Sequence, residues 1–468
     1  MPSPRVNRLT AAAVAAALAP LTAGAQAAPG NEELLQKIEE LSQKVLVLER
    51  KLEVQDEAAR AAAASAPVVK AGSKGFSLQS ADGKNQVKLR GVVHVDGRFF
   101  ASDTPAGVVD TWQATRVRPI LEGTVGGIYD FRFTPDFGQG RTVIQDAYVT
   151  ARFKPEVQVT AGKFKMPVGL ERLQSANDIR FVSRAFPTSL VPNRDLGVQV
   201  AGNLLDDRLN YAVAWTNGVN DGGSSESFSD VDVNNGKDWS GRLFAQPFAD
   251  SDRFALRGLG LGIAGTYTSE TGTTSQTLLA SYRTPAQATF FTYRTGATAT
   301  VLDGERSRLA PQFYYYFGRF GLLGEYTTVS QRVSRTTSTV TRSDTLDTQA
   351  WQVAASWFLT GEEASFRGFK PNDVFSLADG TWGAFELVAR YHELDTDDDA
   401  FVGGAASFAD PDFAASQARG YAVGLNWYLN ENLKWFLDYE HTSFDGGAPG
   451  GGDRDDEKVF LTRFALGF

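Results

Sequence analysis

The sequence predicts an all-β fold: a 16-stranded antiparallel transmembrane β-barrel with an N-terminal periplasmic coiled-coil helix. Three observations predict it. The chain begins like an exported protein, stretches of roughly ten residues alternate between apolar and polar side chains from about Gly75 onward, and short connections alternate with long ones. A soluble β-sandwich also alternates. Export, long strands and aromatic residues near the strand ends favour the membrane barrel.

The first element, residues 1–27, has the pattern of a secretory signal peptide. Arg5 and Arg8 precede an apolar run that ends near Leu21, and small residues follow up to Ala25 and Ala27. This run is too short to cross about 30 Å of hydrocarbon, so we expect cleavage near one of these two alanines rather than a membrane anchor. The chain has no cysteine, which excludes disulfides and thiolate chemistry.

The second element is a predicted coiled coil at residues 31–57, followed by a linker at 58–75. The segment is strongly charged, and its apolar residues recur at spacings of four and three, which is a heptad seam. The residues of the seam are Leu34, Ile38, Leu41, Val45, Leu48 and Leu52. The alternative is an amphipathic helix packed on a globular domain. The narrow seam and its polar flanks favour a parallel coiled coil, which implies self-association.

The remaining chain, residues 76–468, forms the predicted barrel domain. We place its strands at about 86–98, 111–124, 128–136, 143–153, 156–164, 196–204, 208–217, 238–248, 257–268, 307–317, 320–330, 349–359, 381–394, 419–429, 433–443 and 458–468. The last strand ends the chain on Phe468, with Phe460 and Phe464 on the same face.

The lengths of the connections indicate which end of the predicted barrel faces the periplasm. Short turns follow the even strands, and long connections follow most odd strands, at 218–237, 269–306, 331–348, 395–418 and 444–457. The short side of such a barrel faces the periplasm, and an even number of strands puts both termini there. One connection, 360–380, follows an even strand and is nevertheless long. It is either a periplasmic excursion or a missed pair of strands.

Charge is unevenly distributed along the chain. Residues 81–200 carry 16 Lys and Arg against 12 Asp and Glu, whereas residues 201–468 carry 21 against 35. We interpret the acidic runs at 395–399 and 453–457 as solvated outer loops, or as loops that hold divalent cations beside lipopolysaccharide. The barrel is wide enough for an aqueous channel, and its third loop, 165–195, falls in the basic part.

The candidate site is a group of arginines predicted to meet where the third loop narrows the pore. Rings of arginine select anions and phosphate, because the guanidinium presents a fixed fork of donors. The alternative is that these are ordinary charges of a polar lumen. The predicted constriction residues are Arg90, Arg116, Arg118, Arg172, Arg180 and Arg184.

Enzymatic chemistry has little support in the sequence. The three histidines, His94, His392 and His441, are far apart and lack metal-ligand spacing. No nucleophile elbow and no glycine-rich phosphate cradle before a helix is present. We therefore expect no enzyme activity, no cofactor and no nucleic-acid partner.

The chain resembles the phosphate-selective porin O/P family from about Phe76 to Phe468. The resemblance is carried by segments such as VKLRGVVHVDGRFF, IQDAYVTARFKP, AGKFKMPVGLERLQSANDIRFVSRAFPTSLVPNRDLGVQVAG and GLNWYLNENLKWFLDYEHT. The family implies trimeric outer-membrane barrels that pass phosphate or related oxyanions without coupled energy, through a lumen lined by basic residues.

The resemblance assigns three arginines directly. Arg118 falls on a basic position of the family's constriction, and Arg172 and Arg184 fall on basic positions of its third loop. Four family positions differ, carrying Val92, Val117, Ile120 and Gln145, the last of which lies beside the candidate residue Asp146.

The expected function is a passive outer-membrane channel, selective for anions such as phosphate, pyrophosphate or related oxyanions. Its expected partners are these anions, outer-membrane lipid and lipopolysaccharide, and two further copies of the chain in a homotrimer. The alternatives are a general or sugar-permeable porin, a structural anchor whose coiled coil holds the cell wall, and a soluble secreted β protein.

Overall fold

The computed structural model describes residues 30–101, 107–228, 232, 234–338, 340–368 and 370–468. The chain divides into two compact units, residues 1–66 and 67–468, and each is described by itself. The predicted signal peptide, 1–27, lies outside the described residues.

The first unit contains one long helix, α1 (Asn31–Ser65). It covers the predicted heptad seam, whose six side chains are 46–60% exposed. The helix also continues into the segment predicted as a linker, because the run between residues 58 and 65 is rich in alanine, the strongest helix former. None of the helices in the described residues combines the length and the apolar character of a membrane span.

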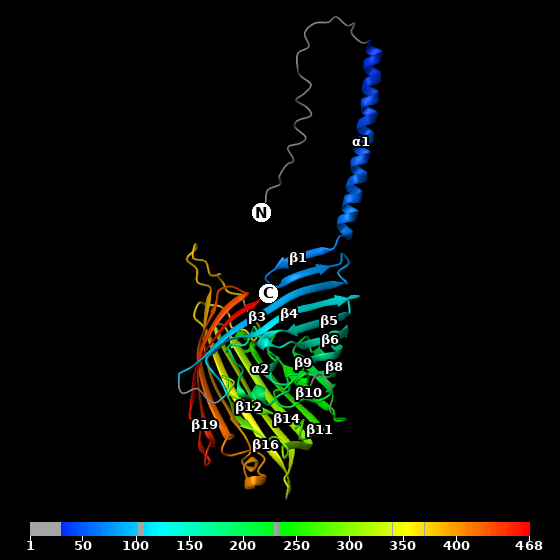
Figure 1. Ribbon diagram of the computed structural model, residues 1–468. Coiled ribbons are helices and arrows are strands. Elements are labelled where there is room, and N and C mark those ends of the chain that lie inside the picture. Colours follow the sequence, from blue (N-terminus) through cyan, green and yellow to red (C-terminus); the bar gives the residue numbers. More distant parts are fainter. Residues whose placement is uncertain (1–29, 102–106, 229–231, 233, 339, 369) are drawn as a thin grey trace. The chain divides into compact units, whose positions relative to one another are not determined.

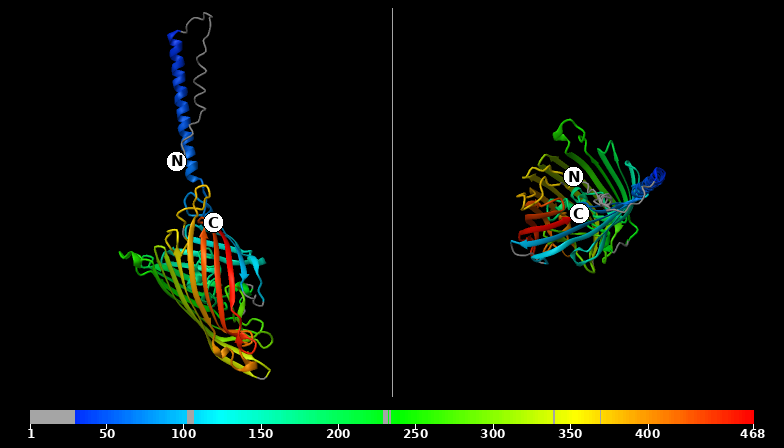
Figure 2. Two further views of the ribbon diagram at one scale, coloured as in Figure 1. Left: turned by 90° about the vertical axis from the view of Figure 1, so that its left-hand side faces the viewer. Right: turned by 90° about the horizontal axis from the view of Figure 1, so that it is seen from above.

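The second unit contains a closed antiparallel barrel of sixteen strands (Figures 1 and 2). Each strand pairs with the next along the chain, and the last pairs with the first from Val459↔Phe100 to Gly467↔Val92. The strands are β3 (Gln86–Phe100), β4 (Thr111–Val125), β5 (Tyr129–Asp136), β6 (Val143–Lys154), β7 (Val157–Lys165), β8 (Arg194–Leu204), β9 (Leu209–Thr216), β10 (Asp238–Ala245), β11 (Leu259–Thr271), β14 (Thr300–Phe317), β15 (Phe320–Thr336), β16 (Thr341–Phe358), β17 (Ala384–Asp395), β18 (Ala415–Tyr428), β19 (Leu433–Ala448) and β21 (Glu457–Gly467). The predicted barrel is confirmed.

Alternation of side chains along each strand separates the outer face from the lumen. On β3, Val87 and Leu89 are exposed on the outside, whereas His94 on the opposite parity is fully buried inside. On β21, Phe460 and Phe464 are exposed outside and Arg463 is buried inside. An apolar exterior suits lipid, and a polar interior suits water and solutes.

The barrel wall is uneven in height. Strands β5, β9 and β10 have eight residues each, whereas β14 and β16 have eighteen. The long connection predicted at 331–348 is therefore wrong, because β15 and β16 continue as a ladder to the pair Thr336↔Thr341. Ser, Thr and Arg fill this extension, so the apolar alternation fades while the backbone pairing persists.

Smaller elements lie at both ends of the barrel. The hairpin of β1 (Val68–Gly72) and β2 (Gly75–Gln79) extends the start of β3; β1 lies in the predicted linker, and β2 lies at the start of the predicted barrel domain. The connections contain β12 (Ser281–Arg283), β13 (Thr289–Thr292), β20 (Gly452–Asp453), the short helix α2 (Leu170–Leu173) and 3₁₀ turns at Gly138–Gly140, Phe186–Ser189, Ser225–Phe228, Phe254–Leu256, Asp398–Ala400 and Gly404–Ala406.

We call the barrel end with short connections, such as 318–319, the turn end, and the opposite end the loop end. The unexpectedly long connection lies at the turn end, between β16 and β17, and contains no named strand among its described residues. It is an excursion rather than a missed pair of strands. We call residues 359–383 the turn-end excursion.

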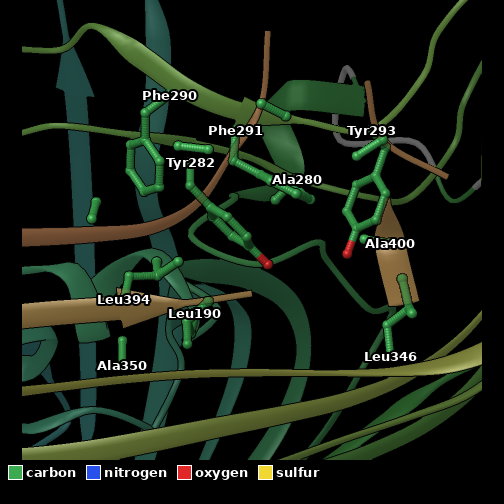
Figure 3. Close-up of a cluster of buried hydrophobic side chains, with 14 of the residues drawn as sticks. Leu190, Ala280, Tyr282, Phe290, Phe291, Tyr293, Leu346, Ala350, Leu394 and Ala400 are labelled. Carbon is green, nitrogen blue, oxygen red and sulfur yellow. The ribbon is translucent and has the colours of Figure 1, made fainter. Parts of the chain in front are cut away.

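A buried aromatic cluster holds two loops together inside the wall (Figure 3). The fifth loop, 272–299, contributes Tyr282, Phe290, Phe291 and Tyr293, and the third loop contributes Leu190. These side chains pack against Leu346 and Ala350 of β16 and Leu394 of β17. Burial of this apolar surface fixes both loops within the barrel.

Candidate functional site

The third loop, 166–193 between β7 and β8, folds inward because lumen-facing carboxylates of distant strands bind its backbone. The N–H of Leu170 donates to Glu325 Oε2 on β15 at 2.6 Å, and the N–H of Val182 donates to Asp438 Oδ2 on β19 at 2.7 Å. Without such acceptors, the buried N–H groups of an irregular segment would remain without hydrogen bonds, which would destabilise the folded protein.

Arg180 is one of these anchors. Its Nε donates to Glu386 Oε1 on β17 at 2.8 Å, and its Nη2 donates to the carbonyl of Ser365 in the turn-end excursion at 2.6 Å. Burial acts to lower the pKa of Arg180, but the carboxylate of Glu386 outweighs it and raises the pKa above its usual value. This arginine therefore has its counter-charge, supplied by a residue far along the chain.

The third loop borders a polar cavity of 710 Å³, which we call the constriction cavity. Its other walls are β3 to β6, β21, the fifth loop and the connection between β9 and β10. Figure 1 labels β3, β4 and α2, three of the elements that contain or flank the lining residues. Eight arginines line the cavity: Arg98, Arg116, Arg118, Arg141, Arg172, Arg184, Arg283 and Arg463.

The four carboxylates that line the cavity are already neutralised. Asp96 binds Arg463 at 2.6 Å, and Asp136 binds Arg118 at 2.7 Å. The other two, Asp221 and Glu226, bind cations outside the lining, at 2.8 Å and 2.7 Å. Among the described residues, six lining arginines form no ion pair within 4.0 Å: Arg98, Arg116, Arg141, Arg172, Arg184 and Arg283. The cavity thus carries a surplus of positive charge.

Neutral groups hold Arg172 and Arg184 in place. Arg184 donates from Nε to the carbonyl of Glu171 and from Nη2 to that of Gln174, both at 3.1 Å. Arg172 donates from Nη2 to the carbonyl of Thr188. Burial lowers the pKa of Arg172 to about 9 and that of Arg184 to about 10. Both remain cationic at neutral pH, so the carbonyls orient these charges without cancelling them.

Arg116 is oriented by a neutral histidine. Its Nη1 lies 3.0 Å from His94 Nδ1, and His94 Nε2 lies 2.7 Å from Asn177 Oδ1 of the third loop. A guanidinium can only donate, so Nδ1 accepts and the histidine proton sits on Nε2. The chain of contacts links the third loop to β4.

The other predicted site residues lie elsewhere. Arg90 borders a separate cavity of 910 Å³ at the turn end and binds Glu122 at 3.2 Å. Asp146 is buried between two arginines, Arg194 at 2.8 Å and Arg132 at 3.4 Å. The cavity therefore gathers Arg116, Arg118, Arg172 and Arg184, but not Arg90, Arg180 or Asp146.

Positions that differ from the related family have contrasting environments. Val92 and Ile120 are buried and do not border the constriction cavity. Gln145 does border it, and its Nε2 donates to Glu226 Oε1 at 3.5 Å. A neutral amide therefore borders the cavity at this position.

Four lining arginines were missed by the sequence analysis. Arg98 and Arg463 lie on the lumen parity of predicted strands, so alternation alone could have identified them. Arg141 and Arg283 lie in or beside connections, where no sequence pattern signals that a side chain turns inward.

Within the described residues, no group of three or more His, Asp or Glu side chains is arranged to hold a metal ion. The chemistry of the cavity is that of hydroxyl, amide and guanidinium donors. Such donors bind oxyanions.

Comparisons with known proteins identify relatives of this barrel. A family model described as phosphate-selective porin O and P matches residues 87–468. The outer membrane channel DcaP of Acinetobacter baumannii has a similar structure, with a TM-score of 0.50 and 12% identity, over 84% of this chain and 99% of that one. The trimer form of OmpT, an outer membrane protein of Vibrio cholerae, has a TM-score of 0.47 and 10% identity, over 82% and 99% of the two chains. The search of curated proteins finds no match.

Proposed function

Because the chain belongs to the phosphate-selective porin O and P family, we propose that it forms a passive, anion-selective channel whose selectivity arises in the constriction cavity. The chain is an outer-membrane porin with a closed barrel. The observation that carries the proposal is the group of six lining arginines without a carboxylate partner. In a confined site such charges attract anions more strongly than they do in bulk water.

The proposed substrates are phosphate, pyrophosphate and related oxyanions. Arg116, Arg118, Arg172 and Arg184 come from β4 and the third loop and border one water-accessible space. Arginine forks match the oxygens of phosphate, and several sites of moderate strength allow an ion to leave as well as enter. Gln145 supports a broad range of anions, because it is a neutral amide among the arginines.

The proposed assembly is a homotrimer, with the turn end and α1 in the periplasm. Six heptad-seam side chains of α1 are about half exposed or more, as expected for surfaces that pair with further copies. Two alternatives remain testable: a general or sugar-permeable porin, and a structural anchor.

The test is the reversal potential of single channels in a lipid bilayer under a potassium chloride gradient. Anion preference is expected, and cation preference or none would contradict the proposal. Phosphate should then block the chloride current. Arg184→Ala should weaken this block by about tenfold, equivalent to ~1.4 kcal/mol, the scale of one charge-assisted hydrogen bond. Arg118→Ala should weaken it as well, because it leaves the carboxylate of Asp136 unpaired in the cavity.

A matched control is Arg253→Ala. Arg253 is exposed in the connection between β10 and β11 and does not border the constriction cavity. It should leave the phosphate block unchanged. If phosphate blocked the chloride current equally in all three variants, the constriction would not lie at Arg118 and Arg184.

A further inference from the structure

A third cavity, of 870 Å³, also lies at the turn end, apart from the one that Arg90 borders, and the third loop does not line it. We call it the turn-end pocket. Its walls are β8, β9, β10, β14, the connections at 205–208 and 246–258, and residues 363–367 of the turn-end excursion. The volume is within the range of small-molecule sites. It differs from the constriction cavity in being bordered by many aromatic rings.

Three rings form a continuous aromatic wall in this pocket. Phe244 of β10 lies 5.1 Å from Tyr314 of β14, measured between ring centroids. Tyr314 stacks on Phe366 of the excursion at 4.9 Å, with an angle of 22° between the rings. The rings share a buried cluster with Leu170 of the third loop, which supports them from behind. Phe244 and Tyr314 are themselves buried, so the half-buried ring of Phe366 offers most of the apolar surface that a ring-shaped ligand can contact.

Arg242 supplies an uncompensated charge beside these rings. Its carbon Cζ lies 4.5 Å from the centroid of Phe244. Its only hydrogen bonds in the described part of the chain are long ones to neutral amides, 3.3 Å to Asn210 Oδ1 and 3.4 Å to Gln312 Oε1. Its Nε is buried without a partner. A guanidinium that is partly desolvated and unpaired is ready for an anion.

The other arginines of the pocket differ from Arg242. Arg208 at the rim is near Asp206 and Asp250, at 3.8 and 3.7 Å, and Arg257 donates to the carbonyl of Ser251 at 2.7 Å. Arg367 is exposed and forms no ion pair among the described residues. The net charge of the lining is positive, with four arginines against Asp207 and Glu363.

We propose that the turn-end pocket binds aromatic carboxylates, with the carboxylate on Arg242 and the ring against Phe244, Tyr314 and Phe366. A small inorganic anion would contact Arg242 but leave the exposed face of Phe366 in water, and an uncharged ring would leave Arg242 unpaired. An aromatic carboxylate satisfies both groups. The site is distinct from the constriction cavity and does not depend on its selectivity.

The test is binding of fluorobenzoate to the purified full-length protein in detergent, followed by ¹⁹F NMR. Fluorobenzoate should bind about tenfold more tightly than acetate, because acetate lacks the ring. Arg242→Gln should weaken fluorobenzoate binding by about tenfold, and Phe366→Ser, in the excursion, should weaken it severalfold. Arg118→Gln in the constriction cavity should leave it unchanged.

The proposal would be overturned if fluorobenzoate showed no saturable binding, or if acetate bound as tightly as fluorobenzoate. It would also be overturned if Arg118→Gln abolished fluorobenzoate binding while Arg242→Gln and Phe366→Ser both retained it. Heat-dependent electrophoretic migration checks that each variant is folded, and Phe366→Ser keeps the test decisive if Arg242→Gln fails to fold. A channel without anion preference would refute the proposed function but not this site, because binding is measured without current.

Discussion

At the scale of single residues, the arginines of this chain divide by what their guanidinium groups contact. Arg180 binds the carboxylate of Glu386 and is structural. Arg172 and Arg184 are held by backbone carbonyls and keep their charge available. A carboxylate cancels a cation, whereas a carbonyl only orients it. The same residue type thus performs two functions within one loop.

This distinction leads to a pH prediction. Burial lowers the pKa of Arg172 to about 9 and that of Arg184 to about 10, so both are protonated below these values. Chloride preference should therefore be constant between about pH 6 and about pH 8, and should decline only above about pH 9, as the cations lose their protons. The measurement is reversal potential in chloride alone, because phosphate itself titrates. A decline near pH 6.5 would contradict the assignment of the selectivity to these arginines.

At the scale of elements, the third loop depends on strands far along the chain. Glu325, Glu386 and Asp438, on β15, β17 and β19, bind its backbone or side chains. The turn-end excursion adds a contact from Gln174 Nε2 to the carbonyl of Phe366 at 2.9 Å. Three carboxylates from the acidic part of the chain therefore hold the basic loop in place.

A double-mutant cycle tests this anchoring. Glu386→Gln leaves the Arg180 charge buried and unpaired, and should destabilise the folded barrel by about 3 kcal/mol, on the scale measured for broken buried ion pairs. It should also raise current noise as the loop loosens. Adding Arg180→Gln should recover part of the loss. Thermal unfolding and single-channel recording are the measurements, and additive losses would show that the pair is not coupled.

At the scale of the whole molecule, the proposed trimer needs a test that separates α1 from the barrel. Leu41→Asp places a charge in the predicted heptad seam, where pairing with other copies would bury it. Val47→Asp makes the same change outside the seam, at a residue that is also exposed. Leu41→Asp should lower the temperature at which trimers dissociate, measured by electrophoresis, and Val47→Asp should not. Equal temperatures for both variants and the wild type would contradict the coiled coil, while conductance should be unchanged throughout.

Alternation and connection length were sufficient to predict the barrel. Apolar and polar faces repeat with the period of a strand, so all sixteen strands could be placed from residues such as Val87, Leu89, Phe460 and Phe464. The same alternation places Arg116 and Arg118 on the lumen side of their strand, where both border the constriction cavity. The strand positions and the lumen-facing side chains depend on residues that are close in the sequence, and on the lipid and water that the barrel wall separates.

Only the tertiary structure decided which arginines meet. Arg283 reaches the constriction cavity because aromatic residues of the fifth loop are buried against the third loop and the barrel wall. Arg180 is withdrawn from it by Glu386, which lies 206 positions away. Strand alternation is set by local backbone geometry, but loop positions are set by contacts between distant residues, whose partners a single sequence does not identify.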